Sequence, residues 1–203
     1  MLTLVIGDKN LSSWSLRSWL ILKQAGIPFT ERLVRLDQPG TKAEIANLSP
    51  SGRVPCLIDG DLAIWDSLAI AEYLAEKFPD KALWPKEPRA RAIARSVSAE
   101  MHSGFQGLRS LWPMNFAREG MQHLTYGIDG DIARIGEIWE QCRRDFGQEG
   151  PFLFGAFSIA DAMYAPVVSR FQTYGPVKLP PLADEWRAMM WSLPAMREWG
   201  QGD

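Results

Sequence analysis

The sequence predicts two parts of different class: an α/β domain over residues 1–78 and an all-helical domain over residues 89–203. In the first part, short apolar β-branched runs alternate with helical patterns, as expected of an α/β domain. Between the two parts, residues 79–88 (PDKALWPKEP) contain three prolines and mixed charge, which is typical of a linker. After this linker the strand patterns fade, and apolar residues recur at helical spacing.

The first domain begins with a predicted βαβ unit. Residues 2–7 (LTLVIG) form a short apolar run that ends at Gly7 and suits a buried strand. A helical pattern follows and stops at Gly26, which we expect to be its C-cap. Residues 28–36 then indicate a second strand. Because a helix connects the two strands, we expect them to be parallel.

The rest of the first domain is predicted as helix, hairpin and helix. Residues 41–52 indicate a short helix that breaks at Ser49-Pro50. The runs CLID and LAIW flank Gly60-Asp61, a turn typical of a tight antiparallel hairpin. The following helix has Ser67 as its predicted N-cap. The first 78 residues therefore predict the order βαβ–α–ββα.

Four helices are predicted in the second domain. The first runs over residues 89–118 and is strained or ended near Pro113. The second spans residues 129–147 and closes at Gly147, the third covers residues 158–171, and the fourth covers residues 182–193.

Composition limits the classes of function. The net charge of −2 gives no general attraction to nucleic acid or to an anionic membrane, and no run of 18 apolar residues could span a bilayer. The N-terminus lacks the features of a signal peptide. Cys56 and Cys142 lie far apart, which argues against a disulfide framework, a zinc site or a dithiol motif. We therefore expect a cytoplasmic protein without metal, nucleic acid or membrane partners.

Val54-Pro55 stands at the start of the predicted strand CLID. Proline cannot donate to a sheet, so this pair must lie at the start or the edge of the strand. If the bond is cis, Val54 turns its N–H and C=O outward, and such a backbone pair can hold an extended peptide in β-fashion. The alternative is an ordinary trans proline that only opens the strand.

Asp66-Ser67 stands where the hairpin ends and the next helix begins. The Ser67 hydroxyl and the first free N–H groups of the helix form an anion site. Asp66 beside them can take an ammonium group. A carboxylate and an ammonium side by side describe an α-amino acid head group. The alternative is a plain helix cap beside a solvated aspartate.

Together, these features resemble the glutathione S-transferase superfamily over the whole chain. The stretch SGRVPCL…DG…IWDSLAIAEYL is similar to its glutathione-site signature, in which a cis-proline and an acid–serine pair bind glutathione. The stretch FSIADAMYAPV resembles the family's C-terminal capping motif, with Ser158 and Asp161 in a structural capping box. The resemblance implies a thioredoxin-like domain followed by a helical domain, with glutathione as co-substrate.

The serine-rich loop SSWSLR matches zeta-like members of the superfamily and aligns Ser12 with the serine that faces the glutathione sulfur. Only the thiolate attacks an electrophile, and a hydroxyl donor at a helix N-terminus favours that charged form. The loop contains no cysteine, and no tyrosine lies near the end of the first strand. The alternatives are that Ser13 or Ser15 faces the sulfur, or that these serines only cap the helix.

Further site residues are implied by the resemblance. The segment SAEMHSGF is similar to the fourth helix of bacterial beta-like members, which would bring His102 to the sulfur; a structural histidine far from the sulfur is the alternative. Beta-like members carry a loop cysteine that this chain lacks, so the subclass stays open.

Lys42 and Arg53 fall where family members contact the glycyl end of glutathione, although Lys42 also suits a solvated helix. A stripe at helical spacing is expected either to line the pocket for the electrophile or to be core: Met101, Phe105 and Trp112.

The resemblance implies a homodimeric transferase that activates the glutathione thiolate for attack on a small electrophile. One alternative is a glutathione-dependent cis–trans isomerase like maleylacetoacetate isomerase, which needs basic groups for a dicarboxylate; Arg17 and Arg109 are available. Another is a glutathione-binding stress or scaffold protein without turnover. The sequence does not identify the electrophile.

Overall fold

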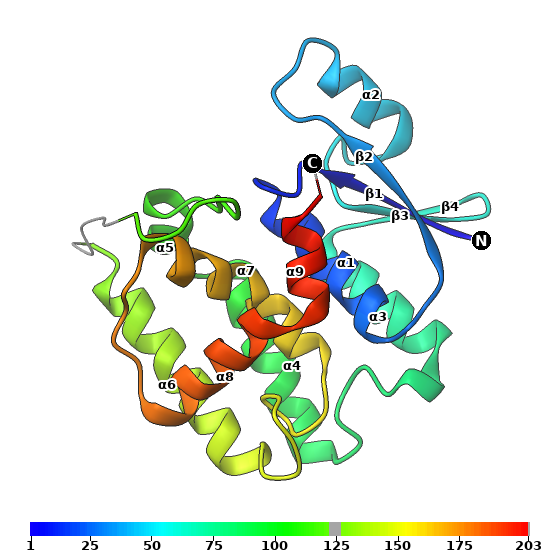
Figure 1. The fold of residues 1–203 in the computed structure, drawn as a ribbon. Helices are drawn as coiled ribbons and strands as arrows, with labels where there is room; N and C mark the ends of the chain where they lie inside the picture. The colour runs from blue at the N-terminus through cyan, green and yellow to red at the C-terminus, as the bar shows by residue number, and fades with distance from the viewer. Residues whose placement is uncertain (122–126, 203) are drawn as a thin grey trace.

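The computed structural model describes residues 1–121 and 127–202. Its first half is built on a four-stranded sheet with the order β2-β1-β3-β4 (Figure 1). The strands are β1 (Leu2–Gly7), β2 (Phe29–Val34), β3 (Cys56–Asp59) and β4 (Leu62–Trp65). β1 pairs with β2 in parallel and with β3 antiparallel, and β3 pairs with β4 antiparallel. The predicted element order, the parallel pairing of the first two strands and the hairpin at Gly60-Asp61 are confirmed.

Helices cover both faces of this sheet. Successive side chains of β1 point to opposite faces, and each face has apolar side chains that a helix buries. Leu4 and Ile6 belong to the large core with α1 (Ser13–Gln24) and α3 (Ser67–Lys77). Val5 points into a smaller cluster with Ile45 of α2 (Thr41–Leu48). Helix α1 ends slightly earlier than predicted, with Ala25 at the C-cap and Gly26 in the left-handed region after it.

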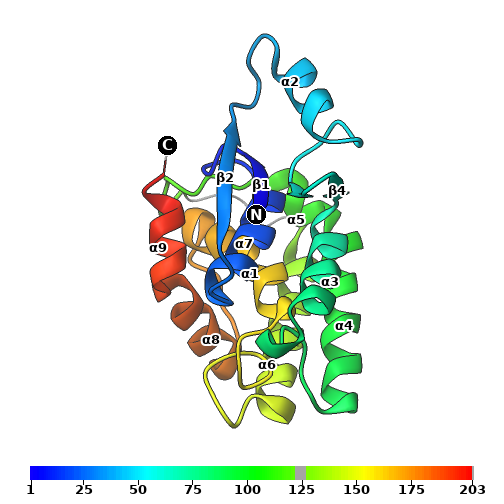
Figure 2. The same ribbon diagram turned by 90° about the vertical axis from the view of Figure 1, so that its right-hand side faces the viewer.

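The linker region is less irregular than the sequence indicates. A short 3-10 turn, η1 (Pro79–Lys81), lies within residues 79–88, and α4 (Pro88–Ser103) already begins at the last of them. Glu87 caps α4 by accepting the backbone N–H groups of Arg89 and Ala90. Helices α3 and α4 lie side by side in both views (Figure 2). The domain limits taken from the sequence remain a prediction.

The single long helix predicted over residues 89–118 is wrong. Helix α4 stops at Ser103, and the chain starts again as α5 (Gln106–Leu111). The break lies at Gly104, where an added Cβ would approach the Glu100 carbonyl oxygen to 2.8 Å, and at Phe105, whose φ is +60°. The chain therefore turns nine residues before Pro113, and this turn places the C-terminal end of α4 next to the first domain.

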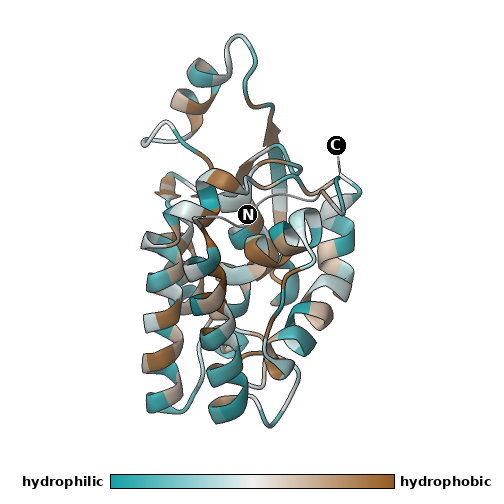
Figure 3. Cartoon of the chain, turned by 90° about the vertical axis from the view of Figure 1, so that its left-hand side faces the viewer, coloured by the Kyte–Doolittle hydropathy of each residue, from teal (hydrophilic) through white to brown (hydrophobic). Residues whose placement is uncertain are grey.

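The remaining helices follow the sequence prediction with one addition. They are α6 (Asp129–Phe146), α7 (Ile159–Tyr174), α8 (Pro181–Ser192) and α9 (Pro194–Gly200). Helix α9 was not predicted; its Trp199 packs edge-on against Trp19 of α1 at 5.2 Å between ring centroids. Helices of this half carry both hydrophobic and hydrophilic residues along their length (Figure 3). No helix of the described residues is long and apolar enough to cross a membrane.

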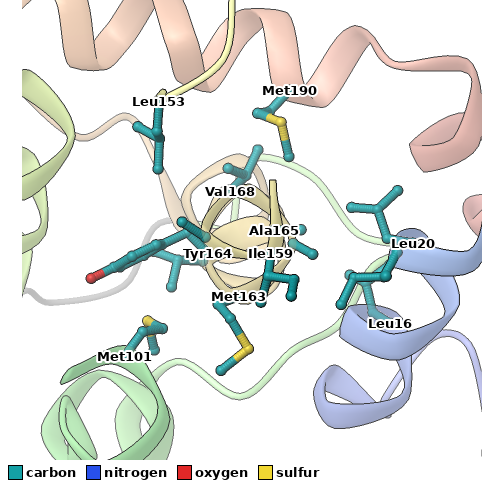
Figure 4. Close-up of a cluster of buried hydrophobic side chains, with 14 of the residues drawn as sticks. Leu16, Leu20, Met101, Leu153, Ile159, Met163, Tyr164, Ala165, Val168 and Met190 are labelled. Atoms are coloured by element: carbon teal, nitrogen blue, oxygen red, sulfur yellow. The ribbon is translucent and has the colours of Figure 1, made fainter. Parts of the chain in front are cut away.

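Helix α7 lies at the centre of the core. Nearly all of its residues are buried, in agreement with a sequence that is mostly apolar over its first ten residues. Figure 4 shows side chains of three other helices gathered around it: Leu16 and Leu20 of α1, Met101 of α4, and Met190 of α8. The first domain therefore contacts the helical half mainly where α1 packs on α7.

The predicted capping box at the start of α7 is confirmed. Asp161 is wholly buried, and its carboxylate accepts the N–H and hydroxyl of Ser158, both at 2.9 Å. It also accepts the Leu153 N–H and the Trp186 indole N–H, each at 2.9 Å. Asp161 thus joins the N-terminus of α7 to the preceding loop and to α8, whereas Ser158 serves α7 alone.

We predict that Asp161→Ala lowers the free energy of unfolding by about 3 kcal/mol, because several buried donors lose their acceptor at once. Ser158→Ala should cost about 1 kcal/mol, the usual loss for a helix cap. Urea denaturation of both variants measures the difference, with Asp184→Ala on the exposed surface of α8 as the control. Equal losses for Asp161→Ala and Ser158→Ala would contradict the wider role of Asp161.

Candidate functional site

A pocket of about 540 Å³ lies beside the sheet, bordered by the segment before β3, the β4–α3 junction, the first turn of α1 and the last turn of α4. Its lining residues are Trp14, Ser51, Arg53, Val54, Pro55, Trp65, Asp66, Ser67 and His102. The pocket therefore combines two indole rings with a carboxylate, an imidazole, a guanidinium and hydroxyl groups.

Many of the residues predicted from the sequence meet in this pocket. Arg53, Val54 and Pro55 reach it from the segment before β3, and the Val54–Pro55 bond is cis. Asp66 and Ser67 reach it from the β4–α3 junction. The resemblance thus pointed to two segments that the fold does bring together. Their roles toward a ligand remain a prediction.

Asp66, not Ser67, is the N-cap of α3, which corrects the sequence prediction. Its Oδ1 accepts the N–H groups of Leu68 at 2.8 Å and Ala69 at 3.2 Å. Asp66 adopts φ +73°, an uncommon conformation that directs the carboxylate back over the helix end. Because Oδ1 is engaged with the helix, Oδ2 is the oxygen left for other partners.

Ser67 is the first residue of α3 and is wholly buried. Its hydroxyl oxygen has no hydrogen-bond partner among the described residues. A buried hydroxyl without a partner is costly, and Ser67 lines the pocket. Hydrogen-bonding capacity is therefore left at the positive end of α3, where an anionic group is favoured.

His102 joins the pocket to α4. Its Nε2–H donates to Asp66 Oδ2 at 3.1 Å, and its ring meets the Trp14 ring edge-on at 5.2 Å between centroids. The Nδ1 atom is buried without a described partner. Burial lowers the pKa of His102, Asp66 opposes that change, and Arg17 and Arg109 add to it. The contacts of His102 favour holding Asp66 over contact with a thiol.

The serine loop is tied to the end of β1. The Ser12 hydroxyl donates to Ser15 Oγ at 2.7 Å, and Ser15 Oγ also accepts the Gly7 N–H at 3.1 Å. Ser12 occupies the N-cap position of α1, but its side chain makes no cap bond. The structure therefore does not support the alternative that the Ser12 side chain only caps the helix. Ser15 is wholly buried, whereas Ser12 and Ser13 retain slight exposure.

Several predicted site residues do not line the pocket: Ser12, Ser13, Lys42, Met101, Phe105 and Trp112. Ser12 and Ser13 adjoin Trp14, which does. Lys42 is exposed on α2. Met101, Phe105 and Trp112 belong to the hydrophobic core. This packing supports the interpretation of the stripe as hydrophobic core. A role of these three residues as a wall of the electrophile pocket stays a prediction.

Trp14 is the main feature that sequence reasoning missed, although it stands inside the serine motif. The guanidinium carbon of Arg17 lies 4.4 Å from the centre of its ring, and that of Arg109 lies 4.8 Å from it. Such stacking is a favourable cation–π geometry. Trp65 and Ser51 also line the pocket and were not singled out, because neither residue type at those positions signals a site.

Neither cysteine is a nucleophile. Cys56 and Cys142 are free and buried. Burial raises the pKa of the Cys56 thiol, and it raises the pKa of Cys142 to about 12. Both therefore stay protonated at neutral pH. In residues 1–121 and 127–202, no group of three or more histidine, cysteine or acidic side chains is arranged to hold a metal ion.

Two family models match the chain, one on each side of the linker. Residues 11–77 match "Glutathione S-transferase, N-terminal domain", and residues 125–199 match "Glutathione S-transferase, C-terminal domain". Together they cover more than half of the chain and include the serine loop, both pocket segments and the capping box.

Curated relatives and solved structures give the same family. A probable maleylacetoacetate isomerase of Caenorhabditis elegans is 37% identical over 51% of this chain and 47% of its own length. Glutathione S-transferase 1 of Dianthus caryophyllus is 36% identical over 54% of this chain and 50% of its own. The chain thus matches about half the length of these relatives. A glutathione transferase homolog from Burkholderia with bound glutathione has a TM-score of 0.71 at 25% identity, covering 98% of this chain and 96% of that one.

The contact between Asp66 and His102 can be tested by titration. We predict that Asp66→Asn lowers the pKa of His102 further, because the carboxylate is the group that favours the imidazolium. NMR titration of the His102 ring measures the change, and His102→Gln assigns the signal between the two histidines of the chain. Ser67→Ala, which keeps the carboxylate, is the control. A His102 pKa that stays the same or rises in Asp66→Asn would exclude the contact.

Proposed function

Because this chain belongs to the glutathione S-transferase superfamily, we propose that it binds glutathione in the pocket beside Asp66 and activates the thiol for attack on a small electrophile. One observation carries the proposal. At the start of α3, a carboxylate whose two oxygens are held by the helix N–H groups and by His102 stands next to a buried hydroxyl that has no partner in the described chain. These are the two groups that an α-amino acid head needs.

The γ-glutamyl head of glutathione fits this corner in one orientation. Its carboxylate would accept from the Ser67 hydroxyl at the positive end of α3. Its ammonium would pair with Asp66, whose Oδ2 is already held by His102. Arg53 lines the same pocket and is the candidate partner for the glycyl carboxylate. Lys42, which does not line the pocket, is a weaker candidate for that carboxylate.

The cysteinyl unit would lie between Val54 and the serine loop, where Ser12 is the candidate donor to the sulfur. A hydroxyl rotates freely about its C–O bond, so the Ser12–Ser15 hydrogen bond can reverse its direction. Ser15 would then accept from Gly7 N–H and donate to Ser12, and Ser12 would donate to the thiolate. Such a chain of donors begins at a fixed backbone N–H and strengthens each bond along it.

A cis–trans isomerase acting on an acidic substrate is the second candidate function. It is supported by the similarity to a probable maleylacetoacetate isomerase and by the two arginines stacked on Trp14, which favour an anion nearby. Both reactions require the same thiolate. They differ in the fate of the thioether. In the transferase it persists, whereas in the isomerase the thiolate adds to the double bond, the resulting single bond rotates, and the thiolate leaves again as the double bond re-forms.

Assays with glutathione and two substrates test these functions together. Conjugation of a chlorodinitrobenzene-type electrophile supports the transferase, and isomerisation of a maleyl-type dicarboxylate supports the isomerase. If calorimetry detects glutathione binding but neither reaction occurs, the third alternative is supported, a glutathione-binding stress or scaffold protein. Absence of glutathione binding would overturn the whole proposal.

The family resemblance also implies a homodimer, and we propose this state too. Its support is that three large apolar side chains, Leu62, Trp65 and Ile93, remain substantially exposed on β4 and α4. Sedimentation analysis measures the oligomeric state directly.

We predict that Ser12→Ala raises the pKa of bound glutathione thiol by about one to two units, because one hydrogen bond to a charged acceptor is worth about 1.5–3 kcal/mol. Turnover at neutral pH should fall while glutathione affinity changes little. Thiolate absorbance against pH measures the shift. Ser13→Ala is the control, and a shift in Ser13→Ala alone would move the assignment to Ser13.

We predict that Asp66→Asn weakens glutathione binding by about 1.5–3 kcal/mol, the range of a hydrogen bond to a charged group. Asparagine remains a good N-cap, so α3 should stay folded. Calorimetry measures the affinity. Asp59→Asn is the matched control, since Asp59 stands in the same hairpin and bonds Tyr73 instead. Unchanged affinity in a folded Asp66→Asn protein would exclude Asp66 from the binding site.

A further inference from the structure

Arg17 is a charged residue at the centre of the molecule. Its side chain is wholly buried on α1, and its Nε–H donates to the Met163 carbonyl at 3.1 Å. Its other two nitrogens, Nη1 and Nη2, have no hydrogen-bond partner among the described residues. Burial lowers the pKa of Arg17 well below its ordinary value, yet an arginine keeps its proton in proteins. A full positive charge is therefore enclosed without a direct counter-ion.

The groups that face Arg17 are mostly positive. Arg109 of α5 and Arg170 of α7 both disfavour its charge. These two arginines also bond only to carbonyl oxygens among the described residues, Arg109 to Gly104 at 3.0 Å and Arg170 to Trp112 at 2.8 Å. Tyr164 of α7 stays neutral because burial raises its pKa.

Among the described residues, the carboxylate that acts most strongly on Arg17 is Asp66, at the start of α3. That carboxylate is already bonded to two backbone N–H groups and to His102. A second carboxylate, Asp131, favours the charge of Arg109. Three arginines thus face two carboxylates, and the positive charge around Arg17 is not fully balanced within the described chain. Such an arrangement is expensive in a protein interior, because isolated buried charges lose their hydration.

Trp14 separates this charge from the pocket. Arg17 lies 4.4 Å from the centre of the Trp14 ring, and Trp14 lines the pocket whereas Arg17 does not. A ligand atom in contact with Trp14 would be about 8 Å from the Arg17 guanidinium, because one further van der Waals contact is added to the stacking distance. The intervening indole and the core around it contain little water to screen the interaction.

We propose that Arg17 is a fixed positive charge behind Trp14 that stabilises the glutathione thiolate at a distance and disfavours protonation of His102. Arg17 touches neither ligand nor sulfur, so it is a positioning residue that acts through the electric field. Its effect on the thiolate rests on the glutathione-binding function proposed above. Its effect on His102 does not, because Arg17 and His102 both lie against the Trp14 ring in the protein without ligand.

The test compares Arg17→Met and Arg17→Gln, which remove the charge, with Arg17→Lys, which keeps it. Arg17→Met has a similar apolar length, and Arg17→Gln retains a donor for the Met163 carbonyl. In the ligand-free protein, the neutral variants should raise the pKa of His102, measured by NMR. In the glutathione complex they should raise the thiol pKa by about one unit, which lowers the thiolate fraction and turnover at neutral pH up to tenfold. Arg17→Lys should stay near wild type.

The outcomes separate the inference from the proposed function. If both pKa values are unchanged in folded neutral variants, Arg17 is structural only and the proposal is overturned. It is also overturned if both neutral variants fail to fold while Arg17→Lys folds, because the charge would then serve the fold. A shift of His102 without a shift of the thiol overturns the effect on the thiolate. If His102 shifts but even the wild type shows no glutathione thiolate, the proposed function fails while the action of Arg17 on His102 stands.

Discussion

The packing of α1 on α7 is the contact on which both the fold and the pocket depend. One side of α1 covers the sheet, and the other meets α7 through Leu16, Leu20 and the hydrogen bond from Arg17 to Met163. Because the serine loop leads directly into α1, this contact fixes the loop relative to the helical half. The end of α4, which carries His102, packs on α7 as well through Met101. The pocket is therefore assembled where two helices of different domains share a third.

Asp66 shows how one side chain meets several demands at this border. One oxygen completes the N-terminus of α3, and the other receives His102 from α4. The same carboxylate is the candidate partner for a ligand ammonium. The cost is a backbone in the left-handed region, at φ +73°, for a residue other than glycine. A second oxygen held in place before the ligand arrives reduces the entropy lost on binding, which is the general benefit of a preorganised site.

The sequence predicted features that depend on near neighbours and missed those that depend on distant ones. The hairpin at Gly60-Asp61 and the capping box of Ser158 and Asp161 follow from residues a few positions apart, so their patterns are visible in the chain. The break at Gly104 was missed because the helical spacing of apolar residues continues across it. The cap of α3 was assigned one residue late, since Asp66 and Ser67 are both good caps. The two pocket segments were singled out from a proline at a strand start and from an acid–serine pair at a helix start, and the family resemblance assigned them to one site.

The contacts of Trp14, Arg17 and His102 could not be predicted from their sequence positions. An arginine four residues after a serine on a helix usually reaches solvent, and only the packing of α7 over α1 encloses Arg17 completely. A protein gains little stability from such a residue: replacing buried ionic groups with apolar ones is often neutral or stabilising. The role of Arg17 is therefore supported by the sign of the net charge around it, which is positive. The described fold leaves an excess of positive charge one ring away from a pocket. This excess favours a negative charge in the pocket, and a thiolate is such a charge.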